Sequence, residues 1–141
     1  MSGLSGIGVK VESGAAAPDE IYANSLPLLH EIRHALARLI ESGEPTVIDV
    51  QSLPMGPGDM KRLMDALGEG EVRAEFEALG KTVIRESRYG GVWIIEHLNG
   101  SGGIAGRFVE ITWVPSLLQS QREDVEAGLE ALADALASAG N

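Results

Sequence analysis

The sequence contains no cysteine among its 141 residues. Its own residues therefore cannot form a disulfide, a thiolate zinc site, an all-cysteine iron–sulfur site or a cysteine nucleophile. Basic residues are scarce too, since 11 Lys and Arg face 21 Asp and Glu and the net charge is −10. Because binding to nucleic acid needs a clustered excess of Lys and Arg, the sequence predicts no nucleic-acid partner and is compatible with a basic one.

Long apolar runs are missing as well. No stretch approaches the ~20 residues that cross a membrane, and the N-terminus lacks the pattern of a signal peptide, so we expect a cytoplasmic protein with no membrane partner. The hydrophobic content of 44% still suffices for one core. Residues 1–20, which are rich in Gly, Ser and Ala, are predicted to form a flexible tail, and residues 21–141 a single domain.

Apolar residues at helical spacing predict three helices. The first covers residues 25–42, with Leu36 at the centre of its stripe, and the second begins near Asp59 as its N-cap. The third follows Ser120, whose distance to Glu123 is that of a capping box. The stripe of the third helix is also predicted to face the core, and it consists of Val125, Leu129, Leu132 and Leu136.

Alternating and β-branched residues predict five strands. They cover residues 46–50, 72–77, 82–88, 92–98 and 107–114. Because the last four follow one another through short turns, we expect an antiparallel meander. The strand over 92–98 is apolar on both faces, so either both faces are covered or one offers an apolar patch to a partner. The predicted fold class is α+β, a two-layer domain with helices packed on a mostly antiparallel β-sheet.

The first candidate for chemistry is His30, Glu31 and His34, which match H-E-x-x-H. This spacing places two imidazoles on one helical face to bind zinc, with the glutamate as a general base. Both histidines lie opposite the apolar stripe, on the expected solvent side, and no third ligand is apparent. A polar helix face that matches by chance is favoured, and a metal-dependent hydrolase is the alternative.

The second candidate combines Glu96 and His97 with Glu110 on the next strand, residue types that bind metals or transfer protons. Adjacent residues of a strand point to opposite faces, so Glu96 and His97 cannot easily share a ligand. Cross-strand pairing with Arg85 or Arg107 is therefore the favoured interpretation. The sequence predicts no catalytic residue, no bound metal and no cofactor.

Four segments have an unusual composition. They are residues 53–59 (Leu-Pro-Met-Gly-Pro-Gly-Asp), 67–72 (Leu-Gly-Glu-Gly-Glu-Val), 91–97 (Gly-Val-Trp-Ile-Ile-Glu-His) and 111–121 (Ile-Thr-Trp-Val-Pro-Ser-Leu-Leu-Gln-Ser-Gln). In this order they resemble the HupH-type hydrogenase expression proteins, a family that includes HyaF. The likeness runs from about Leu28 to about Leu136.

The resemblance implies a non-catalytic assembly factor, or chaperone, in the maturation of an uptake nickel–iron hydrogenase. Such a factor binds a hydrogenase subunit precursor, here expected to be the iron–sulfur small subunit, and acts beside other maturation proteins. Without cysteine, the chain cannot hold an iron–sulfur cluster through thiolates of its own. Self-association into a homo-oligomer through an exposed sheet edge stays an alternative.

We expect residues of these segments to contact the partner, and two of them, Met55 and Glu69, have no evident packing role. The expected contact residues are Met55, Pro57, Asp59 and Glu69, with Trp93 on the strand that forms an apolar floor. Binding groups are commonly held on loops by a rigid scaffold, and an exposed methionine adapts to a protein surface. The prolines and glycines of the loop over 54–59 can instead simply set the entry angle of the second helix. At least one of Trp93 and Trp113 is expected in the core.

Overall fold

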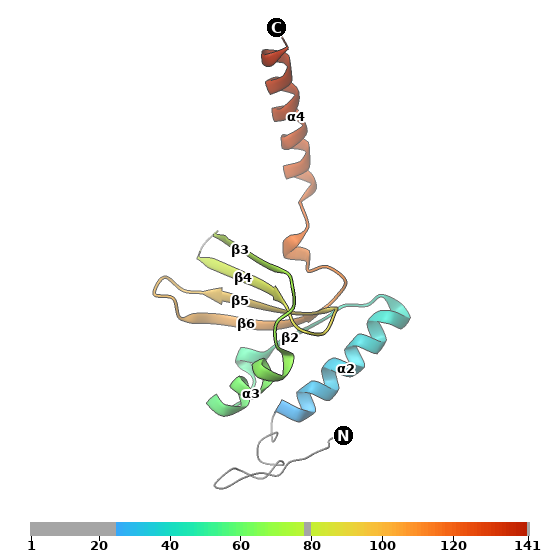
Figure 1. The fold of residues 1–141 in the computed structure, drawn as a ribbon, viewed down its shortest axis with the longest axis vertical. Helices are drawn as coiled ribbons and strands as arrows, with labels where there is room; N and C mark the ends of the chain where they lie inside the picture. Colours follow the sequence, from blue (N-terminus) through green and yellow to red (C-terminus); the bar gives the residue numbers. More distant parts are fainter. Residues whose placement is uncertain (1–24, 78–79, 141) are drawn as a thin grey trace.

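The computed structural model describes residues 25–77 and 80–140, so the predicted tail over 1–20 lies outside the described part. The elements follow in the order α2 (Ser25–Ser42), β2 (Thr46–Asp49), η1 (Val50–Ser52), α3 (Pro57–Leu67), β3 (Arg73–Glu77), β4 (Lys81–Glu86), β5 (Val92–Leu98), β6 (Ile104–Ile111), η2 (Ser116–Leu118) and α4 (Arg122–Ala139) (Figure 1). The predicted α+β class and all three helices are confirmed.

The five strands form one sheet in the order β2-β6-β5-β4-β3, with every neighbouring pair antiparallel. Strands β3 to β6 are the predicted meander, and β2 joins it at the far edge beside β6. The last strand covers 104–111 rather than the predicted 107–114, because the glycine-rich loop before it is shorter than expected and its pairing with β2 and β5 ends at Ile111.

The helix ends differ in detail from the predictions. Helix α2 ends as expected at Gly43, whose positive φ of 76° lets its N–H donate to Leu39 at 2.8 Å. Helix α3 begins at Pro57, so Asp59 is its third residue and not its N-cap. The predicted capping box at Ser120 is wrong, because α4 begins one residue later, with Gln121 as the N-cap and no side-chain cap.

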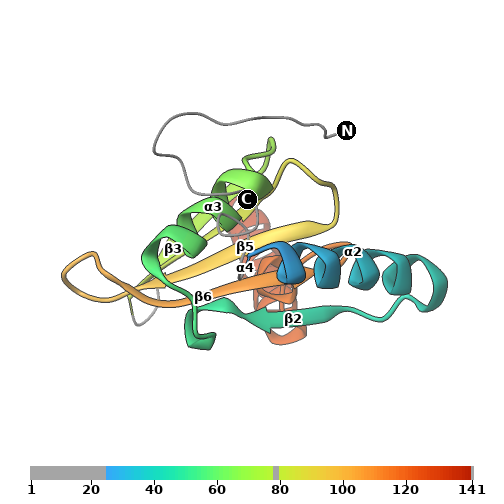
Figure 2. The same cartoon turned by 90° about the horizontal axis from the view of Figure 1, so that it is seen from below.

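The main core lies between the sheet and helices α2 and α3, which cover the same face (Figure 2). Its buried members come from helices α2 and α3, from strands β2, β5 and β6, and from η1. Among them are Leu39, Leu63, Ile94 and Val109. The opposite face carries a smaller cluster of Ile84, Trp93 and Ile95, against which Phe76, Phe108 and Leu118 pack. Strand β5 is thus covered on both faces, the first of the two predicted alternatives.

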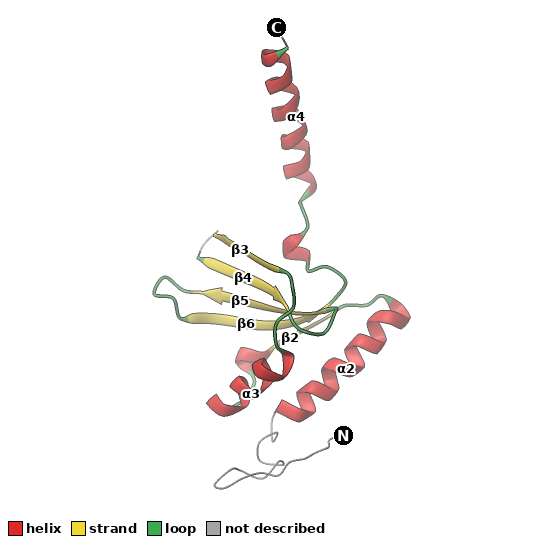
Figure 3. Ribbon diagram, viewed as in Figure 1, coloured by secondary structure: helices red, strands yellow, loops and turns green. Residues whose placement is uncertain are grey.

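Helix α4 stands apart from both layers and projects from the side of the sheet opposite α2 and α3 (Figures 1 and 3). All of its residues are exposed, so the prediction that its stripe faces the core is wrong. The four stripe residues Val125, Leu129, Leu132 and Leu136 are between 58% and 70% exposed. Helical spacing defines an apolar face, but it does not determine which surface covers that face.

Candidate partner-binding site

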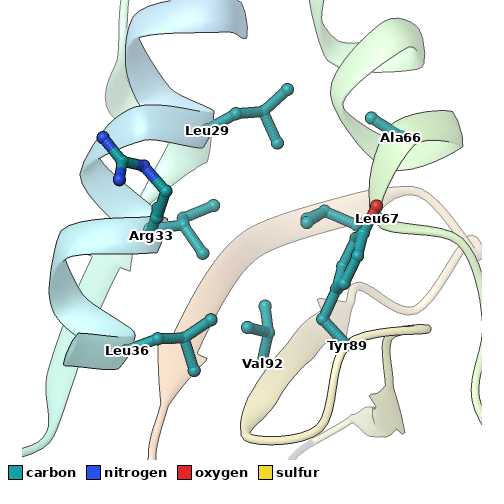
Figure 4. A pocket seen from close by; sticks show the side chains of 8 residues that line it. Leu29, Arg33, Leu36, Ala66, Leu67, Tyr89 and Val92 are labelled. Atoms are coloured by element: carbon teal, nitrogen blue, oxygen red, sulfur yellow. The ribbon is translucent and has the colours of Figure 1, made fainter. Parts of the chain in front are cut away.

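An apolar groove of about 310 Å³ lies between α2 and α3 (Figure 4). Its lining residues are Leu29, Ile32, Arg33, Leu36, Ala66, Leu67, Tyr89 and Val92. This volume is at the lower limit of ligand pockets, about 300 Å³, and suits one or two apolar side chains better than a large cofactor.

Helix periodicity explains why Leu29 and Leu36 line the groove. They are seven residues apart, so they lie on the same side of α2, at the border of its buried stripe, and both are half-buried. Gly91 allows Leu36 to come close, since a Cβ at Gly91 would lie 3.3 Å from the Leu36 Cδ2 atom. The positive φ of Gly91, 86°, also makes the turn that leads into Val92 at the floor.

The rim of the groove carries two exposed polar side chains, Arg33 on α2 and Tyr89 in the turn between β4 and β5. The Ser87 hydroxyl fixes this turn, because it accepts from the Tyr89 N–H and donates to the Tyr89 carbonyl, each at 3.0 Å. Tyrosine and arginine are enriched at the energetic centres of protein interfaces. The lining contains no carboxylate and no imidazole, and its charged or hydroxyl-bearing side chains are those of Arg33 and Tyr89.

A second, shallower hollow of about 220 Å³ lies at the start of α2 and is lined by Pro27, Leu28, Glu31, Leu53, Pro54 and Met55. Met55 was expected to be exposed, but it is half-buried and packs against the main core. The loop over 53–56 brings it there, and its N–H donates to the Leu53 carbonyl at 2.8 Å. Met55 therefore contributes to folding as well as to an open surface.

The other predicted contact residues do not form one surface with Met55. Asp59 accepts a hydrogen bond from the Gly56 N–H at 3.2 Å, so its carboxylate stabilises the start of α3, where Pro57 is the first residue. Glu69 is exposed but follows the other end of α3, whose eleven residues extend about 16 Å. The structure therefore separates these residues along the helix.

Trp93 lies on the opposite face of the sheet from α2 and α3, and only 6% of it is exposed. Its indole N–H donates to the Thr112 carbonyl at 3.2 Å. The expectation that one tryptophan belongs to the core is confirmed, while the expectation of Trp93 as an open apolar floor is not, because neighbouring side chains cover it. Trp113, in contrast, is 63% exposed.

The H-E-x-x-H residues His30, Glu31 and His34 are all exposed, as their position opposite the stripe predicted. Over residues 25–77 and 80–140, no group of three or more His, Asp or Glu side chains is arranged to hold a metal ion. The His34 ring lies next to the Arg33 guanidinium, with Arg33 Nη2 at 3.4 Å from His34 Nε2.

The polar residues of β5 and β6 pair across strands. The carboxylate of Glu96 binds Arg107 at 2.8 Å, as one of the two predicted pairings. His97 points to the opposite face, where its Nδ1 lies 2.9 Å from the Thr82 hydroxyl. Glu110 lies beside Trp93 and not beside Glu96, and burial raises the pKa of its carboxyl group.

Tyr89 and the groove as a whole were not predicted from the sequence. A signal was present in α2, because Leu29 widens the stripe of Leu28, Ile32 and Leu36 beyond what a single packed layer covers. Sequence spacing could not show, however, that the turn carrying Tyr89 lies next to α2.

These features define a class: a small α+β domain with an apolar groove between two helices on one face of its sheet. The comparisons with known proteins name the family. Residues 22–139 match the model of the HupH hydrogenase expression protein, C-terminal conserved region, and the chain belongs to this family.

Two relatives show how much of the family's length is present. The chain is 29% identical over 121 residues to the hydrogenase expression/formation protein HupQ of Azotobacter chroococcum mcd 1, a match covering 84% of this chain and 42% of that protein. It is also 29% identical over 120 residues to HupH of Rhizobium leguminosarum bv. viciae, with 85% and 42% covered. The chain thus spans about two-fifths of the length of these relatives.

A solved structure supports the fold. The hydrogenase expression protein HupH from Thiobacillus denitrificans ATCC 25259 is 40% identical, with a TM-score of 0.78, and the match covers 82% of this chain and 97% of that one. Within the described residues, no helix combines the length and the hydropathy that a membrane crossing requires.

Proposed function

We propose that this chain is a non-catalytic assembly factor in hydrogenase maturation, which binds a hydrogenase subunit precursor in the cytoplasm. The observation that carries the proposal is the apolar groove between α2 and α3, with Arg33 and Tyr89 on its rim. Membership of a family of hydrogenase expression proteins supplies the class of partner. The iron–sulfur small subunit is the precursor that we propose first.

Binding would consist of the reversible burial of an apolar side chain of the precursor. The half-buried Leu29, Leu36 and Ala66 provide the apolar contact, and Tyr89 can close over it. The net charge of −10 would attract a basic segment of the precursor and increase the rate of association. No bound cofactor is needed for this step, so we propose none.

Residues outside the groove are proposed to make separate, additional contacts or to support the fold around it. Met55 and Glu69, at opposite ends of α3, are proposed as further contacts, and Pro57 and Asp59 as residues that fix the start of that helix. Buried Trp93 would act only indirectly, by stabilising the sheet on which the groove rests.

The test is affinity capture of the hydrogenase subunits by tagged protein in hydrogenase-expressing cells, followed by mass spectrometry and a binding titration. Tyr89→Ala combined with Arg33→Glu should weaken binding of the captured subunit by about tenfold or more, since the loss of an interface centre costs over about 1.4 kcal/mol. Arg73→Glu is the matched control, because it reverses the same charge on the exposed edge strand β3. Equal binding of all three proteins would place the interface elsewhere.

Glu69→Lys tests the electrostatic part separately, because Glu69 is exposed and its replacement leaves the core intact. We expect slower association and a weaker dependence on salt, with an unchanged melting temperature. Met55 is less suitable, since its packing against the core would mix stability with binding.

The alternative function, a metal-dependent hydrolase that uses His30, Glu31 and His34, makes a distinct prediction. It requires about one zinc ion per chain in the purified protein, which His34→Ala would remove. We expect less than about 0.1 equivalent of zinc, iron or nickel by elemental analysis, with no change in the variant. Stoichiometric metal would favour the enzyme.

A further inference from the structure

Helix α4 carries an apolar surface that its own chain does not cover. The helix has 18 residues, which corresponds to a length of about 27 Å. Its stripe of Val125, Leu129, Leu132 and Leu136 is mostly exposed, and α2 and α3 lie on the other side of the sheet (Figure 1). A leucine-rich stripe of this length is rarely left in water and marks a contact with another molecule.

The spacing of the stripe indicates what kind of surface covers it. Successive members are four, three and four residues apart, which is the a/d spacing of a coiled coil. Such a stripe is narrower than the apolar face of a helix that packs on a sheet, and it fits the side of one other helix. Three of the four residues that flank it are small, namely Gly128, Ala133 and Ala135, and the fourth is Glu126, so a second helix can approach closely along most of the stripe.

The order four, three, four is the same in both directions along the helix. We infer that α4 is a self-association surface, on which the stripe pairs in antiparallel orientation with the same stripe of a second copy of the chain. In this register Val125 lies opposite Leu136 of the second copy, and Leu129 opposite Leu132. Each residue pair then occurs twice, as the two-fold symmetry of a homodimer requires.

The acidic residues of α4 favour a second copy in this orientation. Five of the 18 residues are acidic, and in an antiparallel pair each of them lies at the axial level of a small uncharged residue of the second copy. The pairs are Glu123 with Ser138, Asp124 with Ala137, Glu126 with Ala135, Glu130 with Ala131, and Asp134 with Ala127. A parallel pair would instead set every carboxylate at the level of its counterpart in the other copy. Because Glu130 and Asp134 lie on the outer side of the pair, this repulsion is a weak, screened preference for the antiparallel orientation.

The placement of the rest of the chain agrees with the antiparallel orientation. The sheet and its helices lie at the N-terminal end of α4, so antiparallel pairing keeps two acidic domains at opposite ends of the helix pair (Figure 1). The C-terminal end of the second helix would then approach the segment before α4. Trp113, Val114 and Leu117 in that segment are also exposed and extend the apolar contact.

The first test is the molar mass of the full chain by sedimentation or light scattering, from about 1 to about 100 µM. We expect a dimer that Leu132→Glu converts to a monomer, with a shift of at least about tenfold in the dissociation constant. Ala127→Glu is the matched control, since it adds the same charge on the exposed side of α4 away from the stripe, and it should remain dimeric.

Because the core includes no residue of α4, we expect Leu132→Glu to stay folded. Circular dichroism and the melting curve check this. A wild-type chain that is monomeric throughout the range overturns the inference, and so does a dimer that Leu132→Glu leaves intact. If the wild-type chain is monomeric and Leu132→Glu loses binding to the hydrogenase subunit, the stripe is the contact surface for that subunit instead. These results are independent of the proposed function, which the Tyr89 and Arg33 variant tests.

The second test fixes the orientation by disulfide formation in air. The chain has no cysteine, so Val125→Cys and Leu136→Cys each provide one reactive thiol. In an antiparallel pair a mixture of the two variants gives the mixed disulfide, while the two copies of position 125 lie about 16 Å apart along the axis, too far for a bond. Predominant disulfides within each single variant would contradict the antiparallel arrangement.

Discussion

Helices α2 and α4 have the same length of 18 residues, and both carry an apolar stripe. The stripe of α2 is buried against the sheet, whereas that of α4 is exposed along its whole length. The connections explain the difference. Gly43 and the short segment after α2 return the chain directly into β2, so the helix lies over the sheet. The segment with Pro115 and η2 directs α4 away from it.

The comparison shows that an amphipathic pattern specifies a need for burial, and that chain geometry decides how this need is met. For α2 the same molecule supplies the partner surface. For α4 a second copy of the chain supplies it in the proposed dimer. Four pairs of substitutions test this contrast between the domain and its last helix, in order of decreasing effect.

Truncation of a stripe leucine should separate the two regions most clearly. Leu63→Ala truncates a completely buried side chain of α3 and should reduce the free energy of unfolding by about 2–5 kcal/mol. Leu129→Ala, at 70% exposure, should cost less than about 0.5 kcal/mol when measured at a dilution where the chain is monomeric. Denaturant titrations of both variants provide the values, and equal losses would mean that α4 packs on its own domain.

Ion pairs should show the same contrast at a smaller scale. Arg107→Met breaks the partly buried pair with Glu96 and leaves that carboxylate without its partner, so we expect a loss of about 1.5–3 kcal/mol. Arg122→Met breaks the exposed pair with Glu126 on α4, which should cost at most about 0.5 kcal/mol. Urea titrations at two salt concentrations distinguish the pairs, since only the exposed one should depend on salt.

Glycine replacements should act in opposite directions. A Cβ at Gly70 would lie 2.5 Å from the Ser87 carbonyl oxygen, so Gly70→Ala should destabilise the domain by at least about 1 kcal/mol. Gly128 lies within α4 with open space around it, so Gly128→Ala should increase helix stability by about 0.5–1 kcal/mol. Thermal melts followed by circular dichroism measure both, and a destabilised Gly128→Ala would indicate a close contact at that position.

The smallest effect concerns pH. Burial raises the pKa of Glu110 above 4.5, so the fold favours its protonated form and loses stability as pH rises through the raised pKa. Glu110→Gln should therefore melt at a higher temperature than the wild type near pH 7, and the difference should disappear below about pH 4.5. Glu130→Gln makes the same change on exposed α4 and should alter the melting temperature little at either pH. A Glu110→Gln variant less stable than wild type near pH 7 would contradict this account.

Much of the fold could be predicted because it depends on local signals. The bounds of α2 follow from its stripe and from Gly43, and the meander follows from short turns such as the one at Gly91. The N-cap of α3 was predicted three residues late, at Asp59 instead of Gly56. Asp59 resembles an N-cap in sequence, but its carboxylate accepts the Gly56 N–H from within the first turn. Local polarity alone does not distinguish these two roles.

The candidate site was less accessible to sequence reasoning. Met55 was chosen for having no evident packing role and Trp93 as an open apolar floor, yet both side chains pack, on opposite faces of the sheet. The groove itself depends on three segments distant in the sequence, namely α2, the end of α3 and the turn with Tyr89. Only the packing of α2 beside α3 on one face brings them together.

The sequence by itself determined the elements, the α+β class, the solvent side for His30 and His34, and the family. These properties depend on periodicity, on turn residues and on a series of short motifs, all of which are local along the chain. The tertiary structure alone decided which stripes are covered, that Trp93 is buried, and that Tyr89 meets α2 across a groove. These depend on how the connections orient helices relative to the sheet, and that orientation is a non-local result of packing.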